Sequence, residues 1–332
     1  NRRFFEEEMN RLDTERNLPL SIIMGDVNGL KLTNDIFGHT FGDILLEKVG
    51  EVLRRVCRAD DIIARWGGDE FVLLLPKTSL AEAEQIIERI KAEFSQEQVK
   101  AIKGSISMGA AAKYSRNDRL MEALESAEEK MYLVKTLEHN EVGSSVVDTI
   151  ITTLHEHSTW EKAHSIHVSE LCQELGRALK LSQVDIRKLK EAGYLHDIGK
   201  VVLDPKKLNK NFNLSDQGWN EIKKHSIVGY RILNSFDDKV DLAESVLAHH
   251  EKWDGSGYPK GLKGEEIPLL ARIISIVESY DRMLHSGSEE AMSKTEAIRV
   301  IKENGGTWFD PHLTELFAQL METNFDESKL GL

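Results

Sequence analysis

The first part of the chain alternates strand-like apolar segments with helical patterns. Apolar residues cluster or alternate, as expected for strands, at residues 20–24, 62–66, 71–75 and 102–108. Gly67 and Gly68 lie between the second and third of these segments and predict a tight hairpin. Apolar residues recur at helical spacing in the segments 44–56, 79–90 and 120–131. This mixture predicts a sheet with helices packed on it, an α/β domain of the α+β sandwich type.

The rest of the chain shows helical periodicity. It begins with Val146, Val147, Ile150 and Leu154 and continues into late segments such as 269–280. A polar stretch with a single glycine, residues 138–144, precedes it. We therefore predict an α/β domain over residues 1–140, followed by an all-α helical domain over residues 141–332.

Composition narrows the classes of function. A chain of 332 residues favours two domains. The formal net charge of −13 argues against a general binder of nucleic-acid polymers or anionic membranes. Only two cysteines, Cys57 and Cys172, are present, which favours a reducing, cytoplasmic compartment without disulfides. No apolar run approaches the length of a membrane-spanning helix and no signal peptide is visible. Because Asn1 lies in an amphipathic pattern, we expect an upstream sensor domain.

Carboxylates gather around the predicted hairpin. Asp26 ends the first strand, and Asp69 and Glu70 follow the two glycines. Carboxylates at strand ends and turns can converge on Mg²⁺, although isolated ones are usually only solvated. Residues 65–71 read Arg-Trp-Gly-Gly-Asp-Glu-Phe, and residues 26–43 carry Asp-Val-Asn-Gly-Leu-Lys with further Asn, Asp and Gly positions. Together these strings resemble the GGDEF family of diguanylate cyclases over residues 1–140.

The resemblance implies a reaction and a site. Two GTP molecules would give cyclic di-GMP and two pyrophosphates, and two domains would have to face each other in a homodimer. Asp26 and Asp69 would bind Mg²⁺, and Glu70 would bind metal or accept a proton. The nucleotide would be held at the guanine by Asn34 and Asp43, and at the phosphates by Gly29, Leu30, Lys31 and Lys135.

Arg58 and Asp61 match the inhibitory product site of that family; the alternative is an ordinary surface ion pair. Three positions depart from the pattern of the family. Asn28 replaces an aspartate, Glu138 a glycine and His139 an arginine. His139 weakens the neutralisation of the phosphates, because imidazole is mostly neutral at pH 7.

Histidines and aspartates recur through the helical part. They are His164, His196, Asp197, His225, His249, His250 and Asp281, with Lys200 three residues after Asp197. Imidazoles and carboxylates are ligands of Fe, Mn or Zn, and helices can aim several ligands at one point. An adjacent His-Asp pair suits a dinuclear site in which the aspartate bridges two ions, an arrangement that serves phosphodiester chemistry.

This set resembles the HD-GYP phosphodiesterase family over residues 145–325. The resemblance implies that the seven residues ligate two Fe or Mn ions, that Lys200 steadies the phosphate, and that Gly257, Tyr258 and Pro259 form the substrate loop. The substrate would be cyclic di-GMP, cut to pGpG or GMP. We interpret His155, His157 and His167 as non-ligands, and His285 and His312 as surface residues.

Two departures concern this second site. Trp160 stands where some members carry a glutamate for a third metal, although Glu161 is adjacent. The segment 285–293 replaces an Arg-Pro-Tyr segment that holds the dinucleotide, which should weaken binding of a dianion.

Three hypotheses follow for the whole chain. It makes and breaks cyclic di-GMP; or it is a phosphodiesterase with the GGDEF domain as a GTP- or product-binding regulatory module; or it is a non-catalytic receptor. The two ligand sets argue against the third. The first two hypotheses both remain open on the sequence.

Overall fold

The computed structural model describes residues 1–208, 216–285 and 291–323. It divides the chain into two compact units, Asn1–Thr149 and Ile150–Leu332. Among the described residues, no helix is both long enough and apolar enough to cross a bilayer.

The first unit is built on a four-stranded antiparallel sheet in the order β2-β3-β1-β6. The strands are β1 (Leu20–Val27), β2 (Ile62–Arg65), β3 (Glu70–Leu75) and β6 (Ile106–Lys113). The pairing of β2 with β3 confirms the predicted hairpin. Ile102 does not extend β6 as expected; it belongs to a short ladder of β4 (Gln98–Val99) with β5 (Ile102–Lys103).

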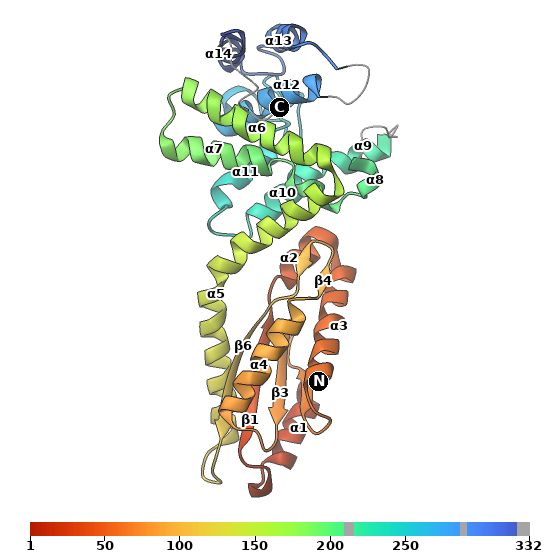
Figure 1. Cartoon of the computed structure of the whole chain (residues 1–332), viewed down its shortest axis with the longest axis vertical. Helices are drawn as coiled ribbons and strands as arrows, with labels where there is room; N and C mark the ends of the chain where they lie inside the picture. The colour runs from red at the N-terminus through yellow and green to blue at the C-terminus, as the bar shows by residue number, and fades with distance from the viewer. Residues whose placement is uncertain (209–215, 286–290, 324–332) are drawn as a thin grey trace. The chain divides into compact units, whose positions relative to one another are not determined.

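Helices cover both faces of this sheet (Figure 1). They are α1 (Arg2–Leu12), α2 (Leu30–Phe37), α3 (His39–Val56), α4 (Leu80–Phe94) and α5 (Leu120–His157). Alternate strand residues face opposite ways. Leu73 and Leu75 pack in the cluster with α3 and α4, whereas Val72 and Leu74 pack in the cluster with α1 and α5. The expected α+β sandwich is confirmed.

The polar stretch 138–144 lies inside α5 rather than in a loop. A single glycine costs a helix about 1 kcal/mol relative to alanine and does not by itself end it. The polar residues of this segment therefore change the composition of the helix without interrupting its backbone.

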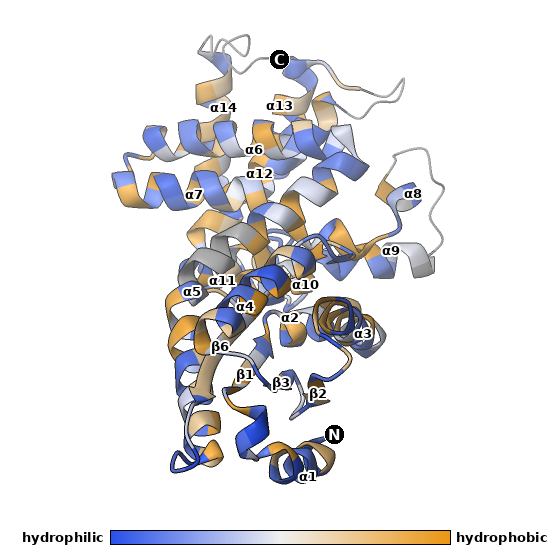
Figure 2. Ribbon diagram, turned by 60° about the horizontal axis from the view of Figure 1, so that its bottom comes forward, coloured by the Kyte–Doolittle hydropathy of each residue, from blue (hydrophilic) through white to orange (hydrophobic). Residues whose placement is uncertain are grey.

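The second unit is helical, as expected for an HD-type domain. Its helices are α6 (Thr159–Ala178), α7 (Gln183–Leu195), η2 (Ile198–Val202), α8 (Pro205–Leu208), α9 (Asp216–Lys223), α10 (His225–Leu233), α11 (Val240–Ala248), η3 (Gly264–Glu266), α12 (Leu269–Leu284), α13 (Lys294–Glu303) and α14 (Pro311–Glu322). Figure 2 shows polar and apolar turns side by side along α6 and α7, as expected for helices with one buried face. Ser158 and Ser182 accept backbone N–H groups at the starts of these two helices and fix where they begin.

One glycine sets how closely α5 approaches the sheet. A Cβ atom at Gly109 in β6 would lie 2.3 Å from the backbone nitrogen of Met131 and 2.4 Å from the carbonyl oxygen of Ala127, both in α5. No side chain fits there unless the helix moves away.

We predict that Gly109→Ala destabilises the first unit by about 1–3 kcal/mol, because overpacking must displace backbone. The matched control is Gly50→Ala in α3, where the nearest atoms belong to the end of the Arg54 side chain at 3.6 Å. The control should be neutral or stabilising by about 0.5–1 kcal/mol. Calorimetry of both full-length variants measures the difference; equal midpoints would contradict the packing argument.

Candidate functional site

Three imidazoles of the helical unit are each fixed by a carbonyl oxygen three residues earlier in the chain. The Nδ1 atoms of His196, His225 and His249 lie 2.7, 2.6 and 2.6 Å from the carbonyl oxygens of Gly193, Ile222 and Val246. A carbonyl can only accept, so each Nδ1 carries the proton and each Nε2 presents a lone pair. Such anchoring of the outer nitrogen is typical of histidines that ligate metals.

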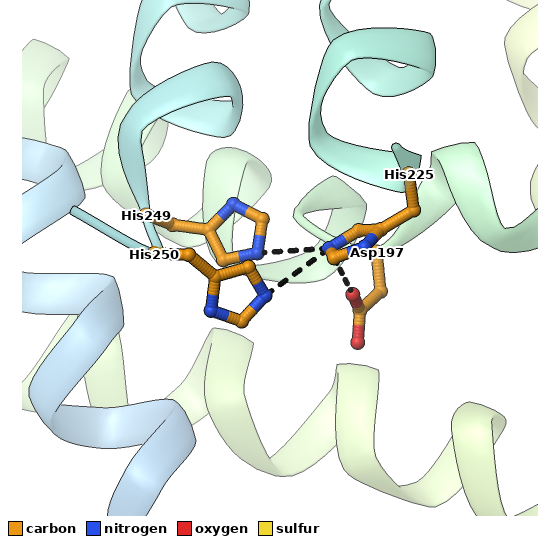
Figure 3. A group of neighbouring side chains, drawn as sticks. All are labelled: Asp197, His225, His249 and His250. Atoms are coloured by element: carbon orange, nitrogen blue, oxygen red, sulfur yellow. Dashed lines mark hydrogen bonds and ion pairs between the residues drawn. The ribbon is translucent and has the colours of Figure 1, made fainter. Parts of the chain in front are cut away.

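The first group of inward ligand atoms comes from Asp197, His225, His249 and His250 (Figure 3). The Nε2 atom of His225 lies 3.3 Å from Nε2 of His249 and 3.2 Å from Nε2 of His250. With the protons of His225 and His249 on Nδ1, two lone pairs face each other across the first of these distances. A cation between them would remove this repulsion.

The second group comprises His164, His196, Asp197 and Glu278. Asp197 belongs to both groups: Oδ1 lies 3.2 Å from Nε2 of His225, and Oδ2 lies 3.1 Å from Nε2 of His196. Three buried atoms, Nε2 of His164, Nε2 of His196 and Oδ1 of Asp197, have no hydrogen-bond partner among the described residues. Buried polar atoms without partners are costly, and these fit a pair of metal ions bridged by Asp197.

A glycine brings these elements together. A Cβ atom at Gly199 in η2 would lie 1.9 Å from the carbonyl oxygen of His225. Backbone therefore meets backbone between η2 and α10, and this contact carries His225 up to Asp197.

Burial keeps most of these imidazoles neutral, which is the form that ligates metals. Burial lowers the pKa of His225 to about 3 and that of His164 to about 4. It also lowers the pKa of His249 and His250. His196 differs: burial alone would lower its pKa, but the adjacent Asp197 carboxylate outweighs burial and raises it.

Lys200 lies inside the site. Its Nζ is 2.7 Å from Oδ2 of Asp197 and 2.8 Å from Oε1 of Glu161, and all three residues are buried. Glu161 thus pairs with Lys200 and is absent from both ligand groups. Trp160 stacks on the His164 ring at 4.7 Å between centroids.

The substrate loop predicted from the sequence packs against the first group. The Tyr258 ring stacks on His250 with centroids 4.8 Å apart. A Cβ atom at Gly257 would lie 2.3 Å from the nitrogen of Lys252, so the loop needs glycine there. Pro259 follows Tyr258 and is exposed. The carboxylate of Glu251, which the sequence did not single out, accepts the backbone N–H groups of Lys260, Gly261 and Leu262.

One predicted ligand requires correction. Asp281 lies behind His164, with Oδ2 2.5 Å from Nδ1 of that ring, and it is in neither group around Asp197. Glu278, three residues earlier on α12, lies in the second group instead. Residues three apart share one helical face, so the sequence did not distinguish these two carboxylates. The sequence did not single out Arg282 either. Its Nε atom lies 2.8 Å from Oε1 of Glu278, and its Nη2 atom lies 3.4 Å from Oδ2 of Asp197.

The remaining histidines divide into two kinds. His155 is buried beside Ser165 and Tyr194, while His157 and His312 are exposed, and all three lie outside the ligand groups. His167 and His285 were set aside as a non-ligand and a surface residue. The structure instead places both on Asp281, at 3.0 and 2.9 Å from Oδ1. Most of the segment that replaces Arg-Pro-Tyr, residues 286–290, lies outside the described residues.

In the first unit the predicted carboxylates meet at one end of the two central strands, β1 and β3. Asp26 pairs in register with Glu70 across β1 and β3, and the Val27 nitrogen donates to the carbonyl oxygen of Asp69 at 3.0 Å. Lys135 Nζ lies 2.8 Å from Oδ1 of Asp26. Burial raises the pKa of Asp26; burial, then the charges of Asp26 and Asp69, raise that of Glu70. A cation such as Mg²⁺ would relieve this repulsion.

The predicted nucleotide contacts lie around α2. Gly29 precedes the helix with a φ of +75°, which favours glycine, and Leu30 and Lys31 form its first turn. The carboxamide of Asn34 covers Gly42, where a Cβ atom would lie 2.0 Å from Oδ1 of Asn34, and Asp43 is exposed on α3.

The residues that depart from the GGDEF pattern form a network of their own. Asn28 Nδ2 donates to the hydroxyls of Ser105 and Ser107 at 3.0 and 3.1 Å. Ser107 donates to Glu138, which also pairs with Lys91. The side chain of His139 lies outside the described residues.

Arg58 and Asp61 lie in the connection from α3 to β2, as expected. Asp61 Oδ2 accepts the backbone N–H of Arg58 at 2.7 Å, so the carboxylate shapes this turn. The Arg58 side chain is exposed.

Comparison with known proteins covers both units. The HD domain family model matches residues 147–313, and the model for the diguanylate cyclase GGDEF domain matches residues 1–141. A cyclic di-GMP phosphodiesterase of Thermotoga maritima is 33% identical over 52% of this chain and 48% of its own length. The 3'3'-cGAMP-specific phosphodiesterase 2 of Vibrio cholerae is 32% identical over 54% of this chain and 35% of its own. The chain thus spans half or less of these relatives.

A solved structure, the GGDEF domain of DgcB from Caulobacter crescentus in complex with c-di-GMP, is 25% identical to this chain. It covers 41% of this chain and 85% of its own, with a TM-score of 0.39.

The geometry predicts that Glu278, unlike an exposed glutamate, holds metal. Glu278→Ala should lower the metal bound per chain by about one equivalent relative to wild type, because a ligand of the second group is lost. Glu315→Ala on the exposed face of α14 is the control and should change nothing. Elemental analysis after dialysis measures both; unchanged metal in Glu278→Ala would remove Glu278 from the ligand set.

Proposed function

Because the chain belongs to the HD domain family and carries a GGDEF domain before it, we propose that its helical unit hydrolyses a cyclic dinucleotide, cyclic di-GMP first of all. The observation that carries this proposal is Asp197, whose two oxygens lie in two different groups of histidines. Bound ions, Fe or Mn in our proposal, would polarise the phosphodiester and stabilise its developing charge.

The residues of the chain supply orientation and fixed charge. Lys200 is held by Asp197 and Glu161, so its ammonium group is a preorganised positive charge beside the reacting phosphate. Arg282 adds a second cation next to Asp197. Arg282, which is not part of the family pattern described above, would offset in part the loss of the Arg-Pro-Tyr cations.

Tyr258 would meet the dinucleotide where it enters. The ring stacks on His250, and the exposed Lys223 places its Nζ 5.4 Å from the ring centroid. An aromatic face with a cation beside it suits a nucleobase and its phosphate. We propose Gly257, Tyr258 and Pro259 as this entry loop.

The relatives' names include phosphodiesterases for cyclic di-GMP and for 3'3'-cGAMP. Purified full chain, loaded with Mn²⁺ or with Fe²⁺ without oxygen, should hydrolyse cyclic di-GMP, and Asp197→Ala should reduce this to background while helicity by circular dichroism is kept. Asp237→Ala, at an exposed position of the same unit, is the control and should retain the rate. Chromatography reads the products. Faster hydrolysis of 3'3'-cGAMP than of cyclic di-GMP would make 3'3'-cGAMP the preferred substrate. Full activity in Asp197→Ala would contradict the catalytic role of Asp197.

We further propose that the GGDEF domain condenses two GTP molecules across a homodimer. Asp26, Asp69 and Glu70 gather where Mg²⁺ would neutralise them, and Lys135 at Asp26 would reach a phosphate once an ion takes its place. Binding by Asn34, Asp43 and residues 29–31 belongs to the same proposal. Arg58 would hold the product from outside the GTP site.

A specific observation favours the regulatory alternative. The network from Asn28 through Ser107 to Glu138 occupies the edge where the family pattern carries an aspartate and a glycine. Its polar groups already satisfy one another. Such a domain could bind nucleotide and regulate the hydrolase without turning GTP over.

Incubation with GTP and Mg²⁺ separates the two. Synthesis should rise per subunit with protein concentration, because each GTP needs a second one opposite, and Asp69→Ala should abolish it. Asp60→Ala, exposed before β2, is the control. Using an Asp197→Ala background prevents loss of product. No product from wild type at any concentration would establish the regulatory alternative.

A further inference from the structure

Three imidazoles surround the carboxylate of Asp281. Oδ2 lies 2.5 Å from Nδ1 of His164, which belongs to the second ligand group. Oδ1 lies 3.0 Å from Nδ1 of His167 and 2.9 Å from Nδ1 of His285. One side of this carboxylate therefore serves the dinuclear centre, while the other side faces two histidines that the centre does not use.

Two neighbouring helices place these residues. His164 and His167 are three apart on α6, and Asp281 and His285 are four apart, at the end of α12 and on its C-cap. Residues at these spacings project from one helical face. Trp160 Nε1 donates to the carbonyl oxygen of His285 at 3.1 Å, which ties the end of α12 to α6. The positions of all three ligand atoms are therefore set by secondary structure.

We infer that His167, Asp281 and His285 form an accessory binding site for a divalent transition metal, separate from the two groups around Asp197. Two imidazole nitrogens and one carboxylate oxygen are the donor set of many Zn²⁺ and Fe²⁺ sites with open positions. The three ligand atoms lie within 4.8 Å of one another.

The distances suit an ion. Ligand atoms about 2.0–2.2 Å from a metal stand roughly 3.0–3.5 Å from each other. The contacts of 3.0 and 2.9 Å on Oδ1 are at or just below the short end of that range, and Nδ1 of His285 also lies 3.2 Å from the carbonyl oxygen of Asp281. The metal would therefore displace the ring protons from these nitrogens, and small rotations of the rings would admit it. The His285 side chain is 38% exposed and that of His167 is 13% exposed, so the ion has a path from solvent and room for water ligands.

The site is electrostatically connected to the inner centre. Asp281 carries one negative charge and shares it between His164 and the accessory site. An ion on Oδ1 would draw charge away from the hydrogen bond that orients His164. A metal ion in the accessory site would therefore lower the affinity of His164 for the ion of the inner centre, because a histidine ligand depends on the hydrogen-bond acceptor of its other ring nitrogen.

The same distances would arise if His167 and His285 only donated hydrogen bonds to Oδ1, and metal counting distinguishes the two cases. Metal-free full-length protein is dialysed to equilibrium against Co²⁺ and the bound metal is measured per chain. His167→Ala and His285→Ala should each bind one equivalent less than wild type. His312→Ala, an exposed histidine outside the ligand groups, should match wild type.

Two further measurements keep the result independent of enzyme activity. Glu278 belongs to the second group and not to the accessory site, so combining Glu278→Ala with His285→Ala should remove a further equivalent. Circular dichroism verifies that each variant is folded. Stoichiometry equal to wild type in both His167→Ala and His285→Ala would overturn the accessory site, whether or not the chain hydrolyses any dinucleotide.

Discussion

The helical unit depends on compensating one buried negative charge, that of Asp197. A carboxylate removed from water costs several kcal/mol unless charges and donors surround it. Here Nζ of Lys200 from η2 lies 2.7 Å from Oδ2, and metal ions held by Nε2 of His196 and of His225, which lie 3.1 and 3.2 Å from the two oxygens, would complete the compensation. The helices must pack so that these groups converge, and Gly199 allows the backbone contact of η2 with α10 that brings His225 to Asp197. The packing of the helices and the arrangement of the site thus both follow from the need to compensate the charge of Asp197.

Much of this arrangement could be read from the sequence. The apolar run 71–75 predicted a strand, and the structure divides its residues between two cores, with Val72 and Leu74 in one and Leu73 and Leu75 in the other. The histidines that follow helices were predictable because their spacing matches a known pattern. Asp281 was not, since it and Glu278 share a helical face and only the packing of α12 decides which one reaches the centre. The contact of His167 with Asp281 could not be predicted for a related reason: the two residues lie 114 positions apart along the chain.

The two units illustrate different uses of carboxylates. In the helical unit every ligand carboxylate has cationic or imidazole neighbours, and the pKa of Asp197 and Glu278 is lowered although burial opposes this. At the edge of the sheet, Asp26 and Glu70 have a raised pKa, because burial and mutual repulsion prevail over Lys135. The helical unit therefore keeps its ligand carboxylates ionised before any metal ion binds. The charges of Asp26 and Glu70 would be neutralised only by a cation that arrives with its nucleotide, so a metal and a ligand would bind there together.

Glu251 has a consequence for the thermodynamics of binding. Its carboxylate receives three successive amides, and so occupies a nest of the kind that elsewhere captures a phosphate. The loop bearing Tyr258 is folded around an anion that the chain itself supplies. Its conformational entropy has been lost at folding and is not lost again when a ligand arrives. Binding of a ligand to the loop that carries Tyr258 should therefore have a small entropic penalty. This preorganisation would partly compensate for the affinity that is lost with the Arg-Pro-Tyr segment.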